Sequence, residues 1–140
     1  MKLPTGARKL CYRDLLWIEP IAKRFGEWEE TLADLDRSQV AMVIPERALV
    51  YVYNDEHGLG IAGNTDEAGI LHMARLFKYM RAWCDQWDNV VHLHFNERQK
   101  WQRALAVGFG CKEANGMFIY SPRGGGGDVH VIGQQVCQSE

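Results

Sequence analysis

The chain has 140 residues, of which 46% are hydrophobic and 24% are charged, so it can bury one sizeable core but is too short for two domains of ordinary size. Its net charge of -2 argues against a protein dominated by phosphate contacts, because such binding needs clustered positive charge. No signal-peptide core is visible and no apolar run approaches membrane-spanning length, so we expect a cytoplasmic protein without a membrane partner.

Four cysteines are scattered along the chain, at Cys11, Cys84, Cys111 and Cys137. None has the Cys-x-x-Cys spacing that is typical of a zinc knuckle or a redox pair. We therefore interpret them as free thiols, which proteins commonly bury like small hydrophobic side chains.

The first part of the chain is predicted to hold one short strand and two helices. Residues 9–12 are a candidate strand, and residues 14–25 have a helical pattern in which Pro20 either opens a new helix or kinks this one. Gly26 breaks this segment. A second helix, ending near Asp36, is marked by three apolar residues at helical spacing: Trp28, Leu32 and Leu35.

Three extended segments are predicted next. Residues 40–44 run into Pro45, which should end a strand or sit at a sheet edge. Residues 48–53 are the clearest strand of this half. Residues 59–63 should pair with them in antiparallel fashion across a turn at residues 54–58.

Residues 66–87 form the longest predicted helix, which should connect two strands in a β-α-β crossover and so imply a parallel strand pair. Its N-cap is predicted at Asn64 or Thr65, with Asp66 and Glu67 complementing the helix dipole in the first turn. An apolar stripe at intervals of four and three should lie against a sheet: Met73, Phe77, Met80, Cys84 and Trp87.

The hydrophobic period changes at Asn96. The residues before it, 90–95, alternate like a half-buried strand. After it we expect an amphipathic helix with Asn96 as N-cap and Gly108 as its end. The predicted apolar stripe of this helix contains Trp101, Ala104 and Leu105.

A hairpin follows this helix. Residues 111–114 and 117–120 flank the turn pair Asn115-Gly116, which favours a primed turn. We therefore expect two antiparallel strands here.

The chain is divided into a single domain over residues 1–122 and a glycine-rich hinge with a C-terminal arm over residues 123–140. The arm contains a short alternating segment at residues 128–133. It is expected either to be a disordered terminus or to pair with a sheet, in which case an oligomer could form through it.

A strand ending at Asn96, a short helix ending in Gly108-Phe109 and a closing hairpin resemble the C-terminal half of the GNAT superfamily of N-acetyltransferases. The resemblance implies an α/β (α+β) fold with a mixed, mostly antiparallel sheet, helices on both faces and a β-α-β crossover. It also implies that the fourth and fifth strands splay apart around acyl-CoA, whose pyrophosphate would lie at the N-terminus of the helix over residues 66–87.

The loop before this helix departs from the family pattern. Family members carry Gln/Arg-x-x-Gly-x-Gly/Ala, whereas residues 63–70 keep only Gly69 of its glycines and no basic residue precedes it. Asp66 and Glu67 stand where phosphate charge would lie. At ~5 Å and an effective dielectric of 20, each repels a unit anion by roughly 3 kcal/mol before screening. The resemblance therefore predicts a poor acyl-CoA site.

The family's general acid is also missing. Many members place a tyrosine four residues before the glycine of Gly-Phe, and Ala104 stands there in this chain. If the protein is active, the catalytic candidates are His92, His94, Glu97 and Tyr120. The residues that would then hold acetyl-CoA are Gly63, Asn64, Ala68, Gly69, Ile70 and Asn96.

Two other kinds of site receive less support from the sequence. His92 and His94 point the same way on a strand and could face a metal or serve as a base, but no third ligand is evident, so no metal site is predicted. Nucleic acid is not the expected partner, because the clustered basic residues also suit a solvated helix face: Arg98, Lys100, Arg103 and Lys112.

Two functions stay open. The eroded loop and intact second half are similar to those of small GNAT-like proteins of tailed phages, encoded beside head and internal virion genes. This implies a protein that has lost efficient acyl transfer and needs no cofactor. Such a protein would bind a phage structural protein or a host protein, in virion assembly or host takeover. It would act in the host cytoplasm or in the virion. The alternative is an active N-acetyltransferase that uses acetyl-CoA and a protein or small-molecule amine.

Overall fold

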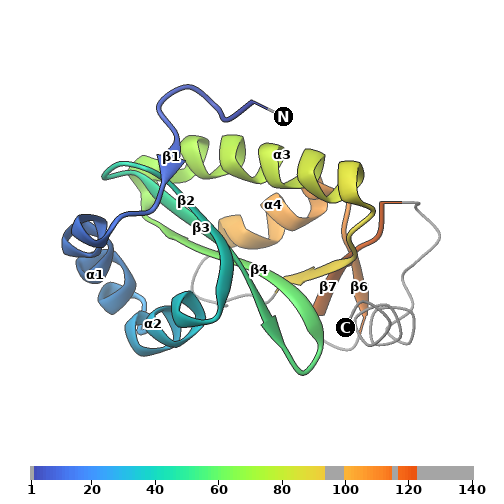
Figure 1. Cartoon of the computed structure of the whole chain (residues 1–140), viewed down its shortest axis with the longest axis horizontal. Coiled ribbons are helices and arrows are strands. Elements are labelled where there is room, and N and C mark those ends of the chain that lie inside the picture. The colour runs from blue at the N-terminus through green and yellow to red at the C-terminus, as the bar shows by residue number, and fades with distance from the viewer. Residues whose placement is uncertain (1, 94–99, 115–116, 123–140) are drawn as a thin grey trace.

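The computed structural model describes residues 2–93, 100–114 and 117–122. Its centre is a mixed sheet with the strand order β1-β2-β3-β4-β5-β7-β6 (Figure 1). The described neighbouring strands are antiparallel except for β4 and β5, which run parallel. The strands are β1 (Arg8–Lys9), β2 (Ser38–Ile44), β3 (Ala48–Asp55), β4 (Gly58–Thr65), β5 (Val91–Leu93), β6 (Lys112–Ala114) and β7 (Met117–Tyr120).

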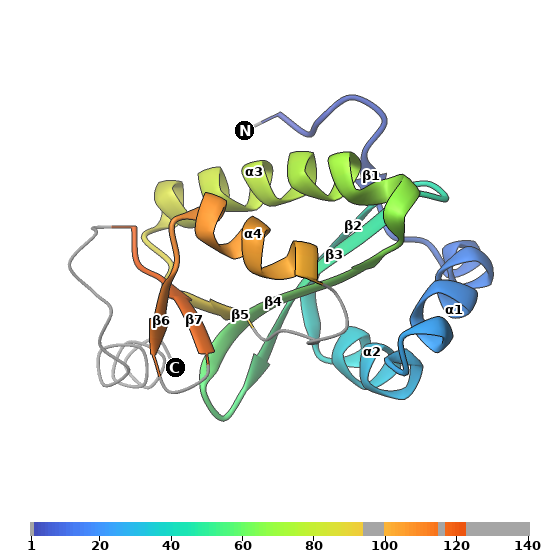
Figure 2. The ribbon, with the colours of Figure 1, turned by 180° about the vertical axis from the view of Figure 1, so that it is seen from behind.

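Helices cover both faces of this sheet. Helices α1 (Leu15–Arg24) and α2 (Trp28–Asp36) lie on one face, and α3 (Ile70–Trp87) and α4 (Lys100–Phe109) lie on the other (Figures 1 and 2). Helix α3 connects β4 to the parallel strand β5. The predicted fold class is therefore confirmed: an α/β fold with a mixed, mostly antiparallel sheet, helices on both faces and a β-α-β crossover.

Strand β3 is buried on both faces, which explains its continuous apolar sequence. Val50 and Val52 pack in the core under α3 and α4, whereas Leu49, Tyr51 and Tyr53 pack in the core under α1 and α2. Because successive side chains of a strand point to opposite faces of the sheet, one apolar run contributes to two cores.

The buried stripe of α3 differs from the predicted one at two positions. Leu76 is fully buried, whereas Trp87, predicted as the last member, is 63% exposed. Trp87 is the last residue of α3, and the chain leaves it through Asp88 in the left-handed conformation, with φ of 55°. The exposure of Trp87 shows that the packed part of the helix ends before its last residue.

Helix α4 also differs from the prediction. Ala104 is exposed, whereas Ala106 and Phe109 are buried. Gly108 lies inside the helix, and Gly110, with φ of 99°, follows its end. The burial of Phe109 explains the later end, because the helix must continue to that residue to place the ring in the core. The predicted cap Asn96 lies outside the described residues.

The N-terminal strand and helix are close to the predicted segments. Strand β1 ends earlier than expected because Tyr12 begins a 3-10 turn, η1 (Tyr12–Asp14). Pro20 lies inside α1 without ending it.

The closing hairpin of β6 and β7 is confirmed as an antiparallel pair. Its turn at residues 115–116 and the predicted hinge and arm at residues 123–140 lie outside the described part of the chain.

Three of the cysteines fall within the described residues, and all three are free. Cys84 is buried as expected and Cys111 is partly buried, and this burial raises the pKa of both thiols to about 12. Cys11 is exposed, so the expectation of burial is wrong for this residue.

No helix in the described ranges combines the length and the apolar content that crossing a bilayer would require.

Candidate functional site

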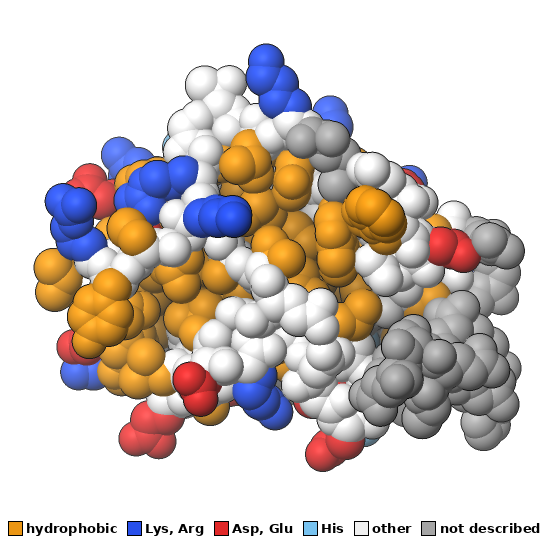
Figure 3. Space-filling model, in the orientation of Figure 1, with side chains coloured by type: hydrophobic (Ala, Val, Ile, Leu, Met, Phe, Trp, Pro, Cys, Tyr) orange, Lys and Arg blue, Asp and Glu red, His pale blue; other side chains and the backbone are white. Residues whose placement is uncertain are grey.

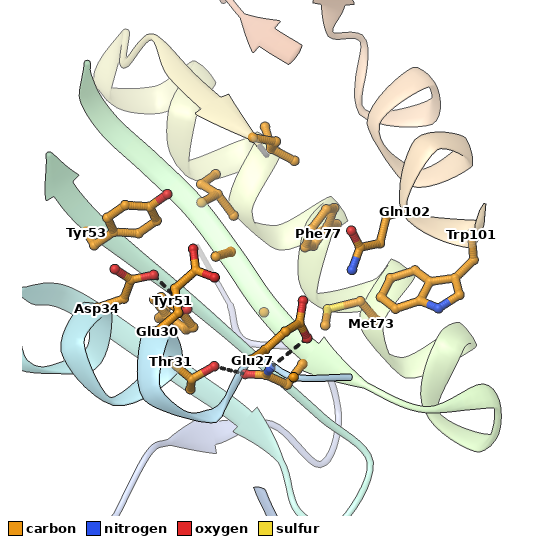
Figure 4. A pocket seen from close by; sticks show the side chains of 16 residues that line it. Glu27, Glu30, Thr31, Asp34, Tyr51, Tyr53, Met73, Phe77, Trp101 and Gln102 are labelled. Atoms are coloured by element: carbon orange, nitrogen blue, oxygen red, sulfur yellow. Dashed lines mark hydrogen bonds between the residues drawn. The ribbon is translucent and has the colours of Figure 1, made fainter. Parts of the chain in front are cut away.

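A pocket of about 300 Å³ lies beside β4 (Figure 4). Its lining includes the consecutive β4 residues Ile61, Ala62, Gly63 and Asn64. Because neighbouring residues of a strand point to opposite faces of the sheet, consecutive residues line one pocket where that pocket passes round the edge of the strand. The pocket therefore joins the α2 side of the sheet to the α3 and α4 side.

The strand edge at the pocket is the one that faces β5. Within the described residues, β4 and β5 share a single paired position, Gly60 with His92. Strand β5 ends at Leu93, which itself lines the pocket. Beyond this point the opposite wall comes from α3 and α4, with Met73, Phe77, Trp101 and Gln102 (Figure 4).

Helix α2 gives the pocket a polar wall. Glu27, Glu30, Thr31 and Asp34 recur at intervals of three, one and three, which places them on one side of a helix. Thr31 is 2% and Asp34 is 5% exposed, whereas Leu32, predicted as part of the apolar stripe, is 40% exposed. The inward face of α2 is thus more polar than predicted, because it borders a pocket rather than a closed core.

The buried polar groups of this wall are hydrogen-bonded to one another. The Thr31 hydroxyl donates to Oδ1 of Asn64 at 3.3 Å, and Nδ2 of Asn64 donates to the Glu27 carboxylate at 3.4 Å (Figure 4). These bonds join α2 to β4, and they offset the cost of burying polar groups. They also hold the wall in a defined shape.

The described lining of the pocket has a negative charge. It contains the three carboxylates of Glu27, Glu30 and Asp34 and no lysine, arginine or histidine. Arg37, which is outside the lining, donates to Asp34 at 2.6 Å and partly balances that charge. The described lining therefore has more negative than positive charge.

Two tyrosines complete the α2 side of the pocket. The Tyr51 hydroxyl donates to Oδ2 of Asp34 at 3.2 Å. Burial, together with the charge of Asp34, raises the pKa of Tyr51 and Tyr53 well above the usual range of a phenol. Both phenols stay protonated at neutral pH, so they can donate hydrogen bonds but do not act as bases.

The turn that leads into α3 binds a carboxylate of the chain itself. Oδ1 of Asp66 accepts the backbone N–H groups of Ala68 at 3.0 Å and Gly69 at 3.2 Å, where the 3-10 turn η2 (Glu67–Gly69) leads into α3. The prediction of Asn64 or Thr65 as N-cap is wrong. Both are still part of β4, and the Thr65 hydroxyl donates to the carbonyl of Arg47 at 2.6 Å.

Gly69 is required for close packing at this helix start. A Cβ atom there would lie 2.0 Å from the Arg47 carbonyl oxygen and 2.1 Å from Oγ1 of Thr65. The second acidic residue, Glu67, is exposed and pairs with Arg24 at 3.0 Å. A hydrogen bond with its own backbone and the nearby Arg24 lower the pKa of Glu67, so it is charged at neutral pH.

The predicted cofactor-binding residues are therefore divided between two places. Gly63 and Asn64 line the pocket, while Ala68, Gly69 and Ile70 lie at the start of α3, outside the lining. The sixth, Asn96, lies outside the described residues.

The catalytic candidate His92 is fully buried. Its Nε2 lies 3.0 Å from Oδ1 of Asp55, and its ring meets the edges of Tyr53 and His57. A Cβ atom at Gly60 would lie 2.8 Å from the His92 ring, so the glycine makes room for it. His92 does not line the pocket.

Tyr120 is also placed away from the pocket. Its hydroxyl donates to Oδ1 of Asp85, and its ring packs edge-on against Phe109. The other two catalytic candidates, His94 and Glu97, lie outside the described residues. Among the residues that are described, no group of three or more His, Cys, Asp or Glu is arranged to hold a metal ion.

The comparisons with known proteins do not assign this site. No protein-family model matches the chain, and searches of curated proteins and of solved structures found no significant match. The chemistry of the site is therefore inferred from its own residues.

Sequence reasoning did not identify the polar wall of α2. The usable signal was the spacing of Glu27, Glu30, Thr31 and Asp34, which forms a polar stripe as regular as the apolar one. A polar stripe normally faces solvent, so the burial of Thr31 and Asp34 becomes visible only when β4 and β3 are in place.

Proposed function

We propose that this protein is GNAT-like, has lost efficient acyl transfer and acts by binding another protein. The observation that carries this proposal is the Asp66 carboxylate bound to the amides of Ala68 and Gly69. In the family that the sequence resembles, amides at this helix start face the acyl-CoA pyrophosphate. Here a phosphate would have to displace a carboxylate while a second one, Glu67, lies beside it.

The arrangement of the strands supports the GNAT-like part of the proposal. The β4-α3-β5 crossover, the single described pair between β4 and β5, and the closing β6–β7 hairpin agree with what the resemblance implies. The pocket lies along the β4 edge, where that family splays its fourth and fifth strands.

The positions of the catalytic candidates support the loss of acyl transfer. His92 is buried against Asp55, and the Tyr120 hydroxyl is bonded to Asp85. Ala104, which stands where the family has its general acid, carries no exchangeable side-chain proton. None of these three residues lines the pocket.

The setting that we propose is phage virion assembly or host takeover, in the host cytoplasm or the virion, as for the phage proteins that the sequence resembles. The face that carries α1 and α2 shows hydrophobic side chains at its surface (Figure 3). Tyr12 is 89% exposed and Leu16 is 79% exposed at the start of α1. Exposed aromatic and aliphatic side chains of this kind suit contact with a protein partner.

Isothermal titration calorimetry with acetyl-CoA tests the proposal. We expect no saturable binding up to about 1 mM, because each carboxylate at the helix start opposes the pyrophosphate. The double variant D66N/E67Q removes both charges and keeps side-chain acceptors for the amides, and it should bring binding into the measurable range. Micromolar affinity of the unmodified protein would contradict the proposal.

An active N-acetyltransferase is the second candidate, and the open edge of β4 favours it. Gly63 and Asn64 line the pocket there, close to carboxylates that could accept a proton from an amine. Glu27 or Glu30 would then be a better placed base than His92.

Mass spectrometry after incubation with acetyl-CoA and a panel of amines and proteins checks this second candidate. Our proposal predicts no acetylated product above the level without protein. An acetylated product that disappears in the double variant E27Q/E30Q would establish the second candidate instead.

A further inference from the structure

We infer that a groove at the start of α1 binds an acidic segment of a partner protein, one that carries an apolar side chain between carboxylates. This inference rests on the proposed function in protein binding and names the chemistry of the partner. The groove has a volume of about 630 Å³ and is lined by residues from 8–17, which run from β1 into α1, and from the turn between β2 and β3. It shares no lining residue with the pocket beside β4.

One part of the groove is apolar. Leu16 and Trp17 line it from α1, and Pro45 lines it from the β2–β3 turn. Leu16 is 79% exposed, and Tyr12, which is 89% exposed, precedes it by four residues and so extends the apolar surface on the same side of the chain. A bound apolar side chain would remove part of this surface from water, which is favourable.

The groove also has cations that no carboxylate of the described chain neutralises. Lys9 and Arg13 border it, both are exposed, and neither makes an ion pair with another described residue. Arg8 is paired with Asp14, so these two charges cancel. The exposed Glu46 offsets one of the remaining cations and leaves one positive charge in excess.

This end of the molecule differs in charge from the rest. Residues 2–17 contain four basic residues and one acidic residue, whereas the whole chain has a net charge of -2. Hydrophobic side chains lie next to Lys and Arg side chains at the α1 end of the face in Figure 3. Carboxylates on either side of an apolar anchor would complement this surface, and opposite charges favour both encounter and the correct orientation of a partner.

The walls of the groove are fixed before a partner arrives. The buried Asp14 carboxylate accepts hydrogen bonds from the Arg8 guanidinium, the Cys11 amide and the Trp17 indole. Trp17 also packs against the core under α1 and α2. Binding therefore need not order these side chains, which lowers its entropic cost.

The concave shape favours a protein segment over a lipid surface. A bilayer presents a broad plane, whereas a hollow of about 630 Å³ has room for a large side chain that projects from a partner. Protein interfaces commonly place an apolar anchor in such a hollow and charged groups around its rim.

The test is an NMR titration of the whole chain with a peptide in which Leu-Phe is flanked by two glutamates on each side. We expect saturable shifts of the Trp17 indole N–H and of the Arg13 and Leu16 amides at peptide concentrations up to about 1 mM. A peptide with lysines in place of the glutamates, and one with Ala-Ala in place of Leu-Phe, should each bind roughly tenfold more weakly or not at all.

Two pairs of matched variants locate the binding site. Arg13→Glu should weaken binding roughly tenfold, whereas Lys78→Glu makes the same charge change at an exposed position of α3 outside the groove and should leave binding unchanged. Leu16→Ser should weaken it severalfold, whereas Leu71→Ser, at a leucine of α3 that is 80% exposed, should not. All four side chains are exposed, so the variants should fold, and circular dichroism checks this.

Absence of saturable shifts, equal weakening by the matched α3 variants or equal binding of the lysine peptide would overturn the inference. So would either of two other occupants: anionic phosphatidylglycerol vesicles, or a second copy of the chain, bound through Leu16 while the acidic peptide is not. The outcome is separable from the acetyl-CoA experiment. Tight acetyl-CoA binding contradicts the proposed function, whereas absence of both acetyl-CoA and peptide binding contradicts only the present inference.

Discussion

Replacing Gly69 with alanine should destabilise the protein by about 3 kcal/mol, at the upper end of the usual cost of overpacking. The added Cβ would meet two atoms that cannot easily move: the Arg47 carbonyl oxygen at 2.0 Å and Oγ1 of Thr65 at 2.1 Å. These two are themselves joined by a hydrogen bond. Relief of the clash must therefore shift η2 away from the end of β4. Urea-induced unfolding, followed by circular dichroism, measures the loss.

Gly108→Ala is the matched control for this substitution. Gly108 lies inside α4, and a Cβ atom there would meet nothing within 4 Å. Alanine should stabilise the protein by about 0.5–1 kcal/mol, because glycine is a poor helix former. If Gly69→Ala were as harmless as Gly108→Ala, the packing assigned to the start of α3 would be wrong.

Asp14→Ala should cost about 2–3 kcal/mol, because it removes the buried carboxylate of a partly exposed ion pair and leaves several donors without an acceptor. Asp14 is 3% exposed. It accepts two bonds of 2.8 Å from the Arg8 guanidinium, one of 2.8 Å from the Cys11 amide and one of 2.9 Å from the Trp17 indole. These bonds connect β1, η1 and α1, so their loss should loosen the whole N-terminal segment.

The effect of Asp14→Ala should depend on pH. Burial alone would raise the pKa of Asp14, but Arg8 and the other donors outweigh it and hold this pKa well below the usual value of a carboxyl. A lowered folded-state pKa stabilises the fold above the unfolded-state pKa of about 4, and this contribution is lost as the pH falls below it. The difference in unfolding free energy between protein and variant should therefore shrink from about pH 5 to pH 2.

Glu19→Ala serves as the control for the Asp14 experiment. Glu19 pairs with Lys23 at 3.0 Å in α1, but both side chains are largely in solvent. An exposed pair of this kind contributes about 0.5 kcal/mol or less. A pH-independent difference for Asp14→Ala, or an equally large loss for Glu19→Ala, would contradict the role assigned to Asp14.

The start of α3 connects stability with function. The same amides that an anion would need are the ones that Asp66 caps, and capping by aspartate is worth about 1 kcal/mol to a helix. A chain that binds a phosphate at this position must leave those amides open. This chain closes them, and the pocket along β4 is a separate place, where the charged groups of the described lining are carboxylates.

Much of the secondary structure could be predicted from the sequence, because it depends on contacts between near neighbours. The alternation of Leu49, Val50, Tyr51 and Val52 defines β3 without reference to the rest of the chain. The crossover followed from the order of strand, helix and strand, since the connection of two parallel strands needs a long segment between them. The predictions were less accurate where helices end. Trp87 was expected to be buried and is exposed, and Gly108 was expected to end α4 but lies inside it.

The sequence by itself determined the strands, the helices and the two acidic residues at the start of α3. Only the tertiary structure decided that Asp66, rather than Asn64 or Thr65, caps the turn η2 that leads into that helix, because β4 runs on through Thr65 to pair with β3. It also decided that Thr31 and Asp34 of the polar stripe of α2 are buried, since the pocket is lined by residues from 27–34, 61–64 and 101–102. Those segments are far apart in sequence, and no local pattern records that the folded sheet brings them together.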